Sequence, residues 1–543
     1  MNMFIKSLLC IFVFSFPVFW GRLFADSNII ERDGFYVRVN IIPDVERIQV
    51  SVDSSFKLYD SRDKLIFISD KPDTLFFEII RSEPAKAVYR PVIREFSLPQ
   101  HKKAKEMVKY VKEKYNIDAE LIMFGNKLVV GGKEILDNRK YLVSAGSYED
   151  IVEARAMRDK LPENLFSSII TQIVSQPEGS IKVDNKDNTL SEDVKNYVKI
   201  IPENENAISK VGVVEIGEKG IVQANTDIGY HSKIEICVGE NGKLGAINEL
   251  SIDKYLYGVI SSEIGGDAPM EALKAQAVCA RANAIKNMAG FKHIGTRYDL
   301  CASVHCQFFG GMKIESENID KAVDATRGEV PVYKGEIIDA VFYSNCGGHT
   351  EDNENVWLGL PIPYLRGVYD GEQPEGWEFP LSDADLKKWI LQPPQNIFCS
   401  AKNSSFPDWI KKRSRWQREF DGKNLAMLVN KQYNIGRIKD LKALKRGVSG
   451  RIIELEITGE GGKVVVEKEL TIRRLLGGLN SSAFLMEMEK KDGFIENLVL
   501  RGAGSGHGVG MCQIGAWGMA LKGFTYQDIL KRYYTGIEIM KLY

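Results

Sequence analysis

Two helical patterns between Ile247 and Gly290, one after the other, constrain the fold of this chain more than any other stretch. In the first pattern, apolar residues recur at helical spacing and predict an amphipathic helix with one buried face. In the second, Asp267 is the expected N-cap, Pro269 lies in the first turn and Gly290 ends the helix. We therefore expect two helices that meet at a short turn, with Glu263 in that turn.

Glu263 is the first candidate for a catalytic role. A carboxylate just past the C-terminal end of a helix lies near partial negative charge, which disfavours its ionised form. A carboxyl group that keeps its proton is what general acid catalysis requires. The alternative is that Glu263 is an ordinary surface glutamate, because glutamate is seldom buried. The residues alone leave both interpretations open.

Five sequence runs, in the same order, resemble the SpoIID/LytB family of bacterial cell-wall proteins. They are KYLYGVISSEI and ALKAQAVCARANAI in the helix pair, then YDLCASVHCQFFGG, FYSNCGGHTEDNENVWLG and GHGVGMCQIGAWGMALKGFTYQDILKRYYTGIEI. The resemblance covers most of the chain from about residue 211 onward. It implies a peptidoglycan lytic transglycosylase that acts on glycan strands, with Glu263 as its catalytic acid/base. LytB-like members are amidase enhancers instead, so a noncatalytic protein that binds peptidoglycan or a cell-wall amidase is the alternative.

A second group of chemically active residues comprises His293, Cys301, His305 and Cys306. Thiolate and imidazole are the ligands that Zn²⁺ prefers, and four of them form a closed tetrahedral site. From spacing alone, a disulfide between Cys301 and Cys306 competes with a metal site in a secreted protein. The resemblance favours zinc, because SpoIID relatives hold zinc through cysteine and histidine in the matching run. Four protein ligands leave no position for a catalytic water, so we expect a structural zinc.

Polar residues in three of the matching runs are candidates for substrate binding. In the second helix, Arg281 could orient Glu263 or bind a sugar carboxylate, although a nearby guanidinium would lower the pKa of Glu263. Paired glycines after residue 346 allow close backbone approach, and neighbouring hydroxyl groups can bond sugar oxygens. The competing interpretation for the basic residues is an ordinary solvated helix face. The candidate set is Lys274, Gln276, Arg281, Tyr343, Ser344, Thr350, His507 and Gln513.

The rest of the chain predicts a multidomain α+β protein. Short runs rich in β-branched and aromatic residues predict a β-rich N-terminal module, and the β-α alternation that follows resembles a SPOR domain, a glycan-binding module. A polar stretch without periodicity predicts a linker. The expected boundaries are 1–25 for a signal peptide, 27–98 for the β-rich module, 99–173 for the SPOR-like module, 174–205 for the linker, and 206–543 for a mixed α+β SpoIID-type core with insertions near 372–425 and 440–472.

Charge and cysteine content narrow the class of partners. The chain has 72 Lys plus Arg and 73 Asp plus Glu, so its net charge gives no reason to propose nucleic acid as a partner. Lys6 and the apolar run that follows predict export, with an uncleaved membrane anchor as the alternative. Of eight cysteines, seven follow the predicted signal peptide, and this odd, unevenly spaced set is not typical of a disulfide framework.

Overall fold

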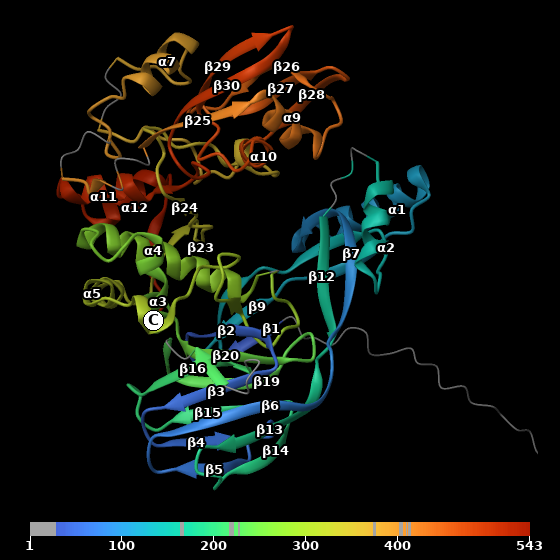
Figure 1. Ribbon diagram of the computed structural model, residues 1–543, viewed down its shortest axis with the longest axis vertical. Coiled ribbons are helices and arrows are strands. Elements are labelled where there is room, and N and C mark those ends of the chain that lie inside the picture. The colour runs from blue at the N-terminus through green and yellow to red at the C-terminus, as the bar shows by residue number, and fades with distance from the viewer. Residues whose placement is uncertain are drawn as a thin grey trace, which may run out of the picture.

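The computed structural model describes residues 29–543, except 163–164, 166–167, 217–221, 226–227, 291, 373–375, 401–404, 409 and 411–413. The predicted signal peptide, residues 1–25, lies outside the described residues. Helices and sheets are mixed along the chain, which confirms the predicted α+β class. Figure 1 shows a β-rich lobe, a mixed lobe with helices α3, α4, α11 and α12, and an arm with α1 and α2.

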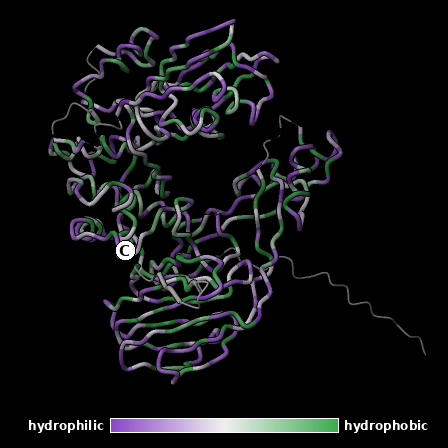
Figure 2. The backbone as a smooth tube through the Cα atoms, in the orientation of Figure 1, coloured by the Kyte–Doolittle hydropathy of each residue, from purple (hydrophilic) through white to green (hydrophobic). Residues whose placement is uncertain are grey.

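Two stacked sheets form the β-rich lobe. In β3, Ile48, Val50 and Val52 alternate with less buried residues and point into the shared core, as period-two alternation requires. The tube in Figure 2 shows the same alternation of apolar and polar residues along these strands. One sheet has the strand order β14 (Ser191–Lys195), β13 (Glu178–Asn185), β6 (Asp73–Glu83), β3 (Arg47–Val52), β16 (Ile208–Ile216), β17 (Val222–Asn225), and β18 (Gly229–His231) also pairs with β16. The other sheet has the strand order β21 (Leu300–Cys301), β2 (Tyr36–Val45), β20 (Leu244–Ser251), β19 (Lys233–Val238), β15 (Tyr197–Pro202), β4 (Phe56–Tyr59), β5 (Leu65–Ser69).

The prediction of a linker over 174–205 is wrong. Strands β13 and β14 pair with each other, β13 pairs with β6, and β15 lies between β4 and β19. The stretch is polar because its strands show one face to solvent, yet Ile181, Val183 and Val198 are fully buried in the core of the lobe. The β-rich lobe is therefore built from two separated parts of the chain, one on each side of the predicted SPOR-like module.

That module is inserted between β6 and β13. It runs β7 (Lys86–Ser97), α1 (His101–Tyr115), β8 (Glu120–Phe124), β11 (Lys140–Ser144), α2 (Ile151–Lys160), β12 (Ser168–Ser175), and its sheet has the order β12-β7-β11-β8. This is the β-α-β-β-α-β order of the ferredoxin-like motif. Strand β8 pairs with β11, whereas β9 (Lys127–Val130) lies between β1 (Ile29–Arg32) and β10 (Lys133–Asp137) in a separate sheet.

Helices α3 (Ile252–Glu263) and α4 (Met270–Met288) lie at the centre of the mixed lobe. Helices α5 (Glu317–Ala325), α11 (Gln513–Leu521) and α12 (Tyr526–Tyr533) pack against α4, together with β22 (Glu329–Tyr333). β22 pairs with β23 (Glu336–Ile337) and with β32 (Glu538–Lys541), and β24 (Phe342–Tyr343) runs parallel to β31 (Met511–Cys512). Segments that are far apart in sequence therefore meet around α4.

A separate hydrophobic core of the mixed lobe lies between Trp416 and Leu500. Its two three-stranded sheets are β25 (Arg415–Asp421), β30 (Phe494–Ala503), β29 (Phe484–Lys491), and β26 (Ile438–Arg446), β27 (Ile452–Gly459), β28 (Gly462–Glu467). Helices α9 (Gly422–Asn430) and α10 (Glu469–Leu475) flank them, while α6 (Asn353–Val356) and α7 (Asp383–Leu391) precede them in the chain. The predicted insertion near 440–472 thus lies mostly in the three-stranded sheet of β26, β27 and β28. Among the described residues, no helix has the length and apolar character needed to cross a membrane.

Candidate active site and metal centre

Helix α3 ends at Glu263. Its first turn is capped by Ser251, whose hydroxyl accepts a hydrogen bond from the Lys254 amide. At the other end, the Ile264 amide donates to the carbonyl of Ile260, and Gly265 takes a left-handed conformation with φ +85°. Glycine at this position is a common helix stop. Glu263 is therefore the last residue of the helix, which corrects the prediction that it lies in the turn.

The start of α4 also differs from prediction. The N-cap is Pro269, which makes no side-chain capping bond, and the helix begins at Met270. Asp267 is exposed and lies two residues before that cap. The expectation that Asp267 is occupied as the helix cap is wrong. Asp267 still belongs to the turn of residues 264–268, and the helix begins only after that turn.

The Glu263 carboxyl group is half-buried, and burial raises its pKa above the usual value of 4.5. Desolvation is the cause of this shift. The predicted direction of the shift was therefore right, although the sequence argument rested on the helix end and not on burial. A half-buried carboxyl group that holds its proton more tightly than usual and still reaches the surface is suited to general acid catalysis.

Arg281 does not orient Glu263, contrary to one of the predicted roles. Its guanidinium group is fully buried and forms an ion pair with Asp253, with Nη2 3.1 Å from Oδ1. It also donates to the backbone carbonyls of Glu329 and Val323. Asp253 lies in the first turn of α3, at the opposite end from Glu263. The face of α4 that carries this guanidinium group packs against several other elements. The charge of Arg281 therefore points into the protein, where it links α4 to α3.

Two more predicted substrate contacts are interior residues. Gln276 is fully buried, and its side-chain carbonyl lies 3.4 Å from the Nε2 atom of Gln513, which is 7% exposed. Thr350 is fully buried and its hydroxyl accepts a hydrogen bond from the Val368 amide at 2.7 Å. Burial therefore corrects the prediction that Gln276, Arg281 and Thr350 contact a glycan, since such a ligand cannot reach them in this structure. Lys274 remains half-buried and pairs with Glu271 at 2.7 Å.

Tyr343, Ser344 and His507 lie together where β24 meets the glycine-rich loop. The rings of Tyr343 and His507 are 4.9 Å apart, and Tyr343 is only 5% exposed. His507 Nε2 lies 3.0 Å from the Phe342 carbonyl, and His507 Nδ1 accepts from the Val509 amide. Burial lowers the pKa of His507 to about 3, so this imidazole is neutral. Because both ring nitrogens are bonded to the backbone, His507 serves the loop and is not available as a metal ligand.

The described tryptophans near residues 377–416 pack within the protein. Trp389 is 2% exposed and donates its indole N–H to the Gly347 carbonyl at 3.0 Å. Trp416 donates to the Gly504 carbonyl, also at 3.0 Å, and Trp377 lies edge-on to Trp389. Trp409 lies outside the described residues.

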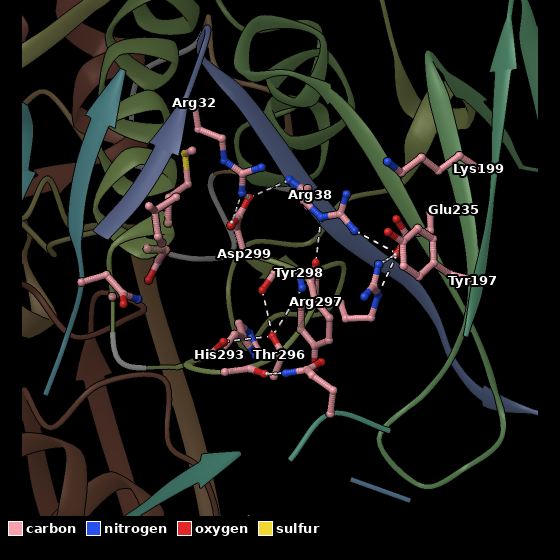
Figure 3. Close-up of a pocket in the computed structure, with 17 residues that line it drawn as sticks. Arg32, Arg38, Tyr197, Lys199, Glu235, His293, Thr296, Arg297, Tyr298 and Asp299 are labelled. Atoms are coloured by element: carbon pink, nitrogen blue, oxygen red, sulfur yellow. Dashed lines mark hydrogen bonds and ion pairs between the residues drawn. The ribbon is translucent and has the colours of Figure 1, made fainter. Parts of the chain in front are cut away.

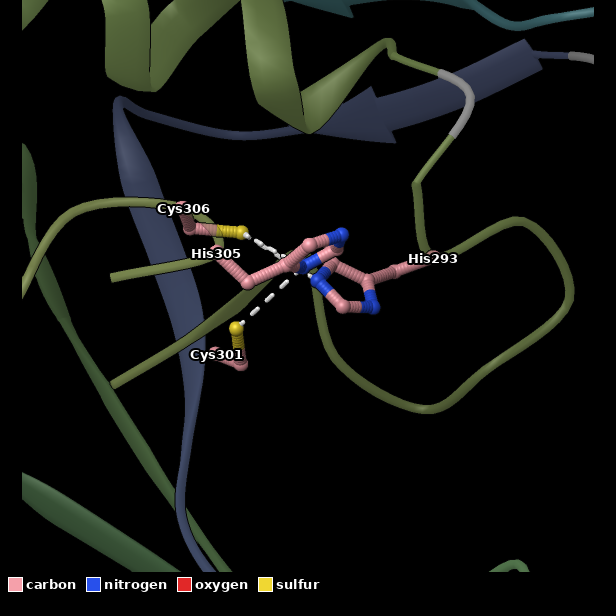
Figure 4. A group of neighbouring side chains, drawn as sticks. All are labelled: His293, Cys301, His305 and Cys306. Carbon is pink, nitrogen blue, oxygen red and sulfur yellow. Dashed lines mark hydrogen bonds between the residues drawn. The ribbon is translucent and has the colours of Figure 1, made fainter. Parts of the chain in front are cut away.

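The predicted metal ligands do converge. The ligand atoms of His293, Cys301, His305 and Cys306 all lie within 4.8 Å of one another (Figure 4). His293 Nε2 is 3.2 Å from Cys306 Sγ, and His305 Nδ1 is 3.6 Å from Cys301 Sγ and 3.9 Å from Cys306 Sγ. Nitrogen and sulfur bound to one tetrahedral Zn²⁺ are about 3.5 Å apart. Both cysteines are free thiols, so the competing disulfide is not formed.

The protonation states of three of these four residues also suit a metal, and Cys306 is the exception. Burial lowers the pKa of His293 to about 4 and lowers that of His305 as well, so both imidazoles are neutral near pH 7. Burial opposes ionisation of Cys301, but hydrogen bonds from Ser303 and Cys306 lower its pKa overall. Burial raises the pKa of Cys306 to about 11. Neutral imidazole and a readily formed thiolate are the forms that bind metal.

The loop that carries the cluster packs directly on α3. The Phe309 ring lies over Gly258, where an added Cβ would come within 2.7 Å of a ring carbon. The Ser262 hydroxyl donates to the Phe308 carbonyl at 3.2 Å, and the Gly310 amide donates to the Gly258 carbonyl at 3.0 Å. The cysteine/histidine cluster therefore braces the helix that ends at Glu263.

Tyr255 connects the two groups and was not predicted as a site residue. It is fully buried on α3, and the centre of its ring is 5.2 Å from that of Phe309. Burial raises the pKa of its phenol well above normal, and the negative charges of Cys306, Cys301 and Glu263 add to this effect. In the sequence, Tyr255 is indistinguishable from the other apolar-face positions of the helix, so no motif could have identified it.

His293 also lines a cavity of about 500 Å³ (Figure 3). Its basic residues are already paired: Arg32 with Asp299 at 2.9 Å, and Arg38 and Arg297 with Glu235 at 3.0 and 2.8 Å. Glu263 is not among its lining residues. The Arg297–Glu235 pair joins the β-rich lobe to the cluster-bearing loop, and the three ion pairs together leave little free charge for an anionic ligand.

The fold and the site together define a class of protein with a two-helix core, in which a half-buried carboxyl group lies beside a cysteine/histidine cluster. The family model described as Stage II sporulation protein (SpoIID) matches residues 240–333, and the model described as domain of unknown function (DUF8618) matches residues 351–510. The first match contains Glu263 and all four residues of the cluster.

Three relatives extend the match beyond that segment. An uncharacterized protein of Brachyspira hyodysenteriae is 31% identical over 338 residues, which cover 61% of this chain and 79% of that protein. Stage II sporulation protein D of Bacillus subtilis is 27% identical over 307 residues, or 54% of this chain and 76% of the relative. The amidase enhancer of Bacillus subtilis is 29% identical over 300 residues, but these are 52% of this chain and only 40% of that protein. The chain belongs to the SpoIID family.

Proposed function

We propose that this protein is a peptidoglycan lytic transglycosylase with Glu263 as its single acid/base. The observation that carries the proposal is the half-buried Glu263 carboxyl group, whose pKa is raised by burial at the end of α3. Membership of the SpoIID family and the match to an amidase enhancer support a role related to the cell wall. On this proposal the protein acts outside the cytoplasm, where its substrate lies.

The proposed reaction cleaves the β-1,4 bond between N-acetylmuramic acid and N-acetylglucosamine without water. Glu263 first gives its proton to the oxygen that leaves, and an oxocarbenium-like centre forms at the muramyl carbon. The Glu263 carboxylate then removes the proton from the muramyl C6 hydroxyl, which closes a 1,6-anhydro ring. The carboxyl group ends the cycle protonated, as it began.

A single carboxyl group is sufficient for this chemistry, whereas a glycoside hydrolase normally uses two. Asp267 is the acidic residue nearest to Glu263 in sequence; it is exposed. The raised pKa of Glu263 is caused by desolvation and not by a second carboxylate beside it. These two observations favour lytic cleavage over a hydrolytic muramidase.

We further propose that His293, Cys301, His305 and Cys306 hold one Zn²⁺ ion. The separations of 3.2 to 3.9 Å between their nitrogen and sulfur atoms support this assignment. With four protein ligands such an ion supplies structural closure, not a reactive water. Its role is to fix the loop on which Phe309 packs against α3.

The alternative function is that of a noncatalytic amidase enhancer, favoured by the 29% identity to a protein of that name. In that case the partner is peptidoglycan or an N-acetylmuramoyl-L-alanine amidase, and Glu263 contributes nothing to activity. The two proposals differ in what the Glu263→Gln variant does, which makes this variant the discriminating reagent.

For the inserted β-α-β-β-α-β module we propose a role in holding glycan strands. Its β12 contacts the cluster-bearing loop: Gly295 has φ +81°, and an added Cβ there would come within 2.8 Å of the Ile173 carbonyl oxygen. A SPOR-like preference for strands without stem peptides would mean that an amidase acts first. Cosedimentation of the full chain with intact and with amidase-treated peptidoglycan tests this: preference for the treated form supports the role, and equal binding contradicts it.

Mass spectrometry of reaction products tests the enzymatic proposal. The protein is incubated with muropeptides and with denuded glycan strands, beside Glu263→Gln and a matched control, Asp267→Asn. We expect anhydromuramyl products from the native protein and from Asp267→Asn but not from Glu263→Gln. Stimulation of a purified amidase by both native protein and Glu263→Gln, without any cleavage of glycan, would favour the enhancer.

A further inference from the structure

Four buried side chains outside the site described above converge on one point in the mixed lobe. Cys346, Asp370, Cys399 and Cys512 each present one ligand atom, and these atoms all lie within 4.8 Å of one another. Cys346 is 3% exposed and the other three have no exposed surface. They belong to four segments: the turn after β24, the chain at residue 370, the loop before residue 400, and the start of α11.

The separations within this group approach those of a shared metal ion. Cys346 Sγ lies 3.2 Å from Asp370 Oδ2 and 3.4 Å from Cys399 Sγ. Around a tetrahedral Zn²⁺ ion, ligand atoms of these types are about 3.6 to 3.8 Å apart. An adjustment of a few tenths of an ångström would therefore convert the contacts into coordination.

Asp370 is the residue that ordinary packing does not explain. Free cysteines are often buried as small apolar side chains, but a carboxyl group without exposed surface is costly unless it is compensated. Asp370 Oδ1 accepts from the Tyr533 hydroxyl at 2.5 Å, and Oδ2 accepts from the Cys399 amide at 3.1 Å. Within the described part of the chain, Asp370 forms no ion pair with a lysine or arginine. A cation bound among the three thiols would provide that compensation.

Backbone amides donate hydrogen bonds to two of the three sulfurs. Cys512 is the N-cap of α11, and its Sγ accepts from the amides of Gly515 and Cys346, each at 3.2 Å. The Gly348 amide donates to Cys346 Sγ at 3.3 Å. Amide donors and the positive end of a helix both stabilise negative charge on sulfur.

We propose that Cys346, Asp370, Cys399 and Cys512 bind a second Zn²⁺ ion, separate from the cysteine/histidine cluster. Three sulfur ligands select a soft or borderline-soft ion, and the carboxylate favours a divalent one. Binding replaces the protons still on the thiols, which leave to solvent, and forms the metal–ligand bonds. The site is closed by protein on all sides, so the ion is structural. It fastens together four segments spread between residues 346 and 512, including the turn that carries Tyr343 and Ser344.

Metal content of the purified full chain tests the proposal. The decisive reagent is the Cys301→Ser/Cys306→Ser variant, because it removes the first cluster and leaves the buried one intact. We expect one tightly bound zinc in this variant by native mass spectrometry and by elemental analysis, and none after Cys399→Ser is added. Cys237→Ser is the matched control, since that buried cysteine belongs to neither cluster and its loss should leave the zinc content unchanged.

Two outcomes would overturn the proposal. One is a Cys301→Ser/Cys306→Ser protein that is folded and carries no zinc. The other is a disulfide between Cys346 and Cys399, found by peptide mapping after alkylation without reductant, because these sulfurs cannot both be crosslinked and bind metal. Since the test relies on a variant with the buried cluster intact, failure of Cys399→Ser to fold would not obscure the result. Cobalt loading of the same variant gives a second readout: thiolate-to-metal charge-transfer absorption is expected, and its absence counts against the site.

Discussion

Glu263 is half-buried at the end of α3, and burial raises the pKa of its carboxyl group. On the proposed mechanism Glu263 must be protonated when substrate binds, so the rate of glycan cleavage should fall as pH rises through that raised pKa. The plateau of high cleavage rate at acid pH should therefore extend above pH 4.5, the usual pKa of glutamate. The check is kcat/KM measured against pH, with Asp267→Asn giving the same profile. An unchanged rate across this range in the native protein would argue against Glu263 as the acid.

The same burial has a consequence for stability. A carboxyl group whose pKa is raised in the folded state binds its proton more tightly there than in the unfolded chain, so it destabilises the fold as pH rises above the unfolded pKa. Glu263→Gln removes this penalty. We expect the variant to have a higher free energy of unfolding at pH 7 and a gain that shrinks towards zero below pH 4.5. Urea titrations at both pH values measure it; a variant less stable at pH 7 would contradict the account.

At the scale of single residues, the sequence predicts the chemical type of a functional residue better than its position in the fold. Glu263 and the four residues of the cysteine/histidine cluster are recognisable because their types and order match a known pattern. Arg281 belongs to the same pattern, yet it is buried and paired with Asp253. A basic residue on a helix looks alike in sequence whether it faces solvent or a carboxylate on a neighbouring helix. Cys346, Asp370, Cys399 and Cys512 have no recognisable spacing, so only the fold brings them together.

Among the elements, the contact between α3 and the cluster-bearing loop is the most exacting. Gly258 admits the Phe309 ring, and a Cβ there would lie 2.7 Å from it. We expect Gly258→Ala to cost about 1–3 kcal/mol by overpacking and to reduce cleavage. Phe309→Leu should restore part of both losses when combined with it. Urea denaturation and product assays of the two single variants and the double variant test this; strictly additive losses would show that the two residues do not interact.

Helices α3 and α4 are joined by the buried Arg281–Asp253 ion pair. Arg281→Met leaves the Asp253 carboxylate without its buried partner and should cost about 3 kcal/mol. Because Arg281 does not contact Glu263, the pH profile of the remaining activity should keep its midpoint. Thermal unfolding and the kcat/KM profile of the folded fraction measure the two effects. A shifted midpoint would mean that Arg281 acts on the Glu263 carboxyl group after all.

Most individual elements could be predicted, but their pairing could not. Periodicity located α3 and the strands of the predicted β-rich module, because each has one face in the core. It did not show that residues 174–205 return to that lobe as β13, β14 and β15. These strands are polar on the solvent face and follow a long insertion, and sheet pairing across an insertion depends on tertiary contacts that local sequence does not carry.

At the scale of the whole molecule, three parts of the protein are arranged around one carboxyl group. The inserted module contacts the cluster-bearing loop, that loop braces α3, and the mixed lobe surrounds α4. This arrangement gives the module a direct route to affect the helix that ends at Glu263. The central claim is that Glu263 alone performs a cleavage in which water takes no part.

The most direct test is cleavage of denuded glycan strands in water enriched in heavy oxygen, with products analysed by mass spectrometry. The account predicts that the native protein forms anhydromuramyl ends without the heavy label, and that Glu263→Gln forms no products. Heavy oxygen at the new muramyl end would show that water is the nucleophile, and cleavage by Glu263→Gln at the native rate would show that another residue is the acid. Either result would contradict the proposed mechanism.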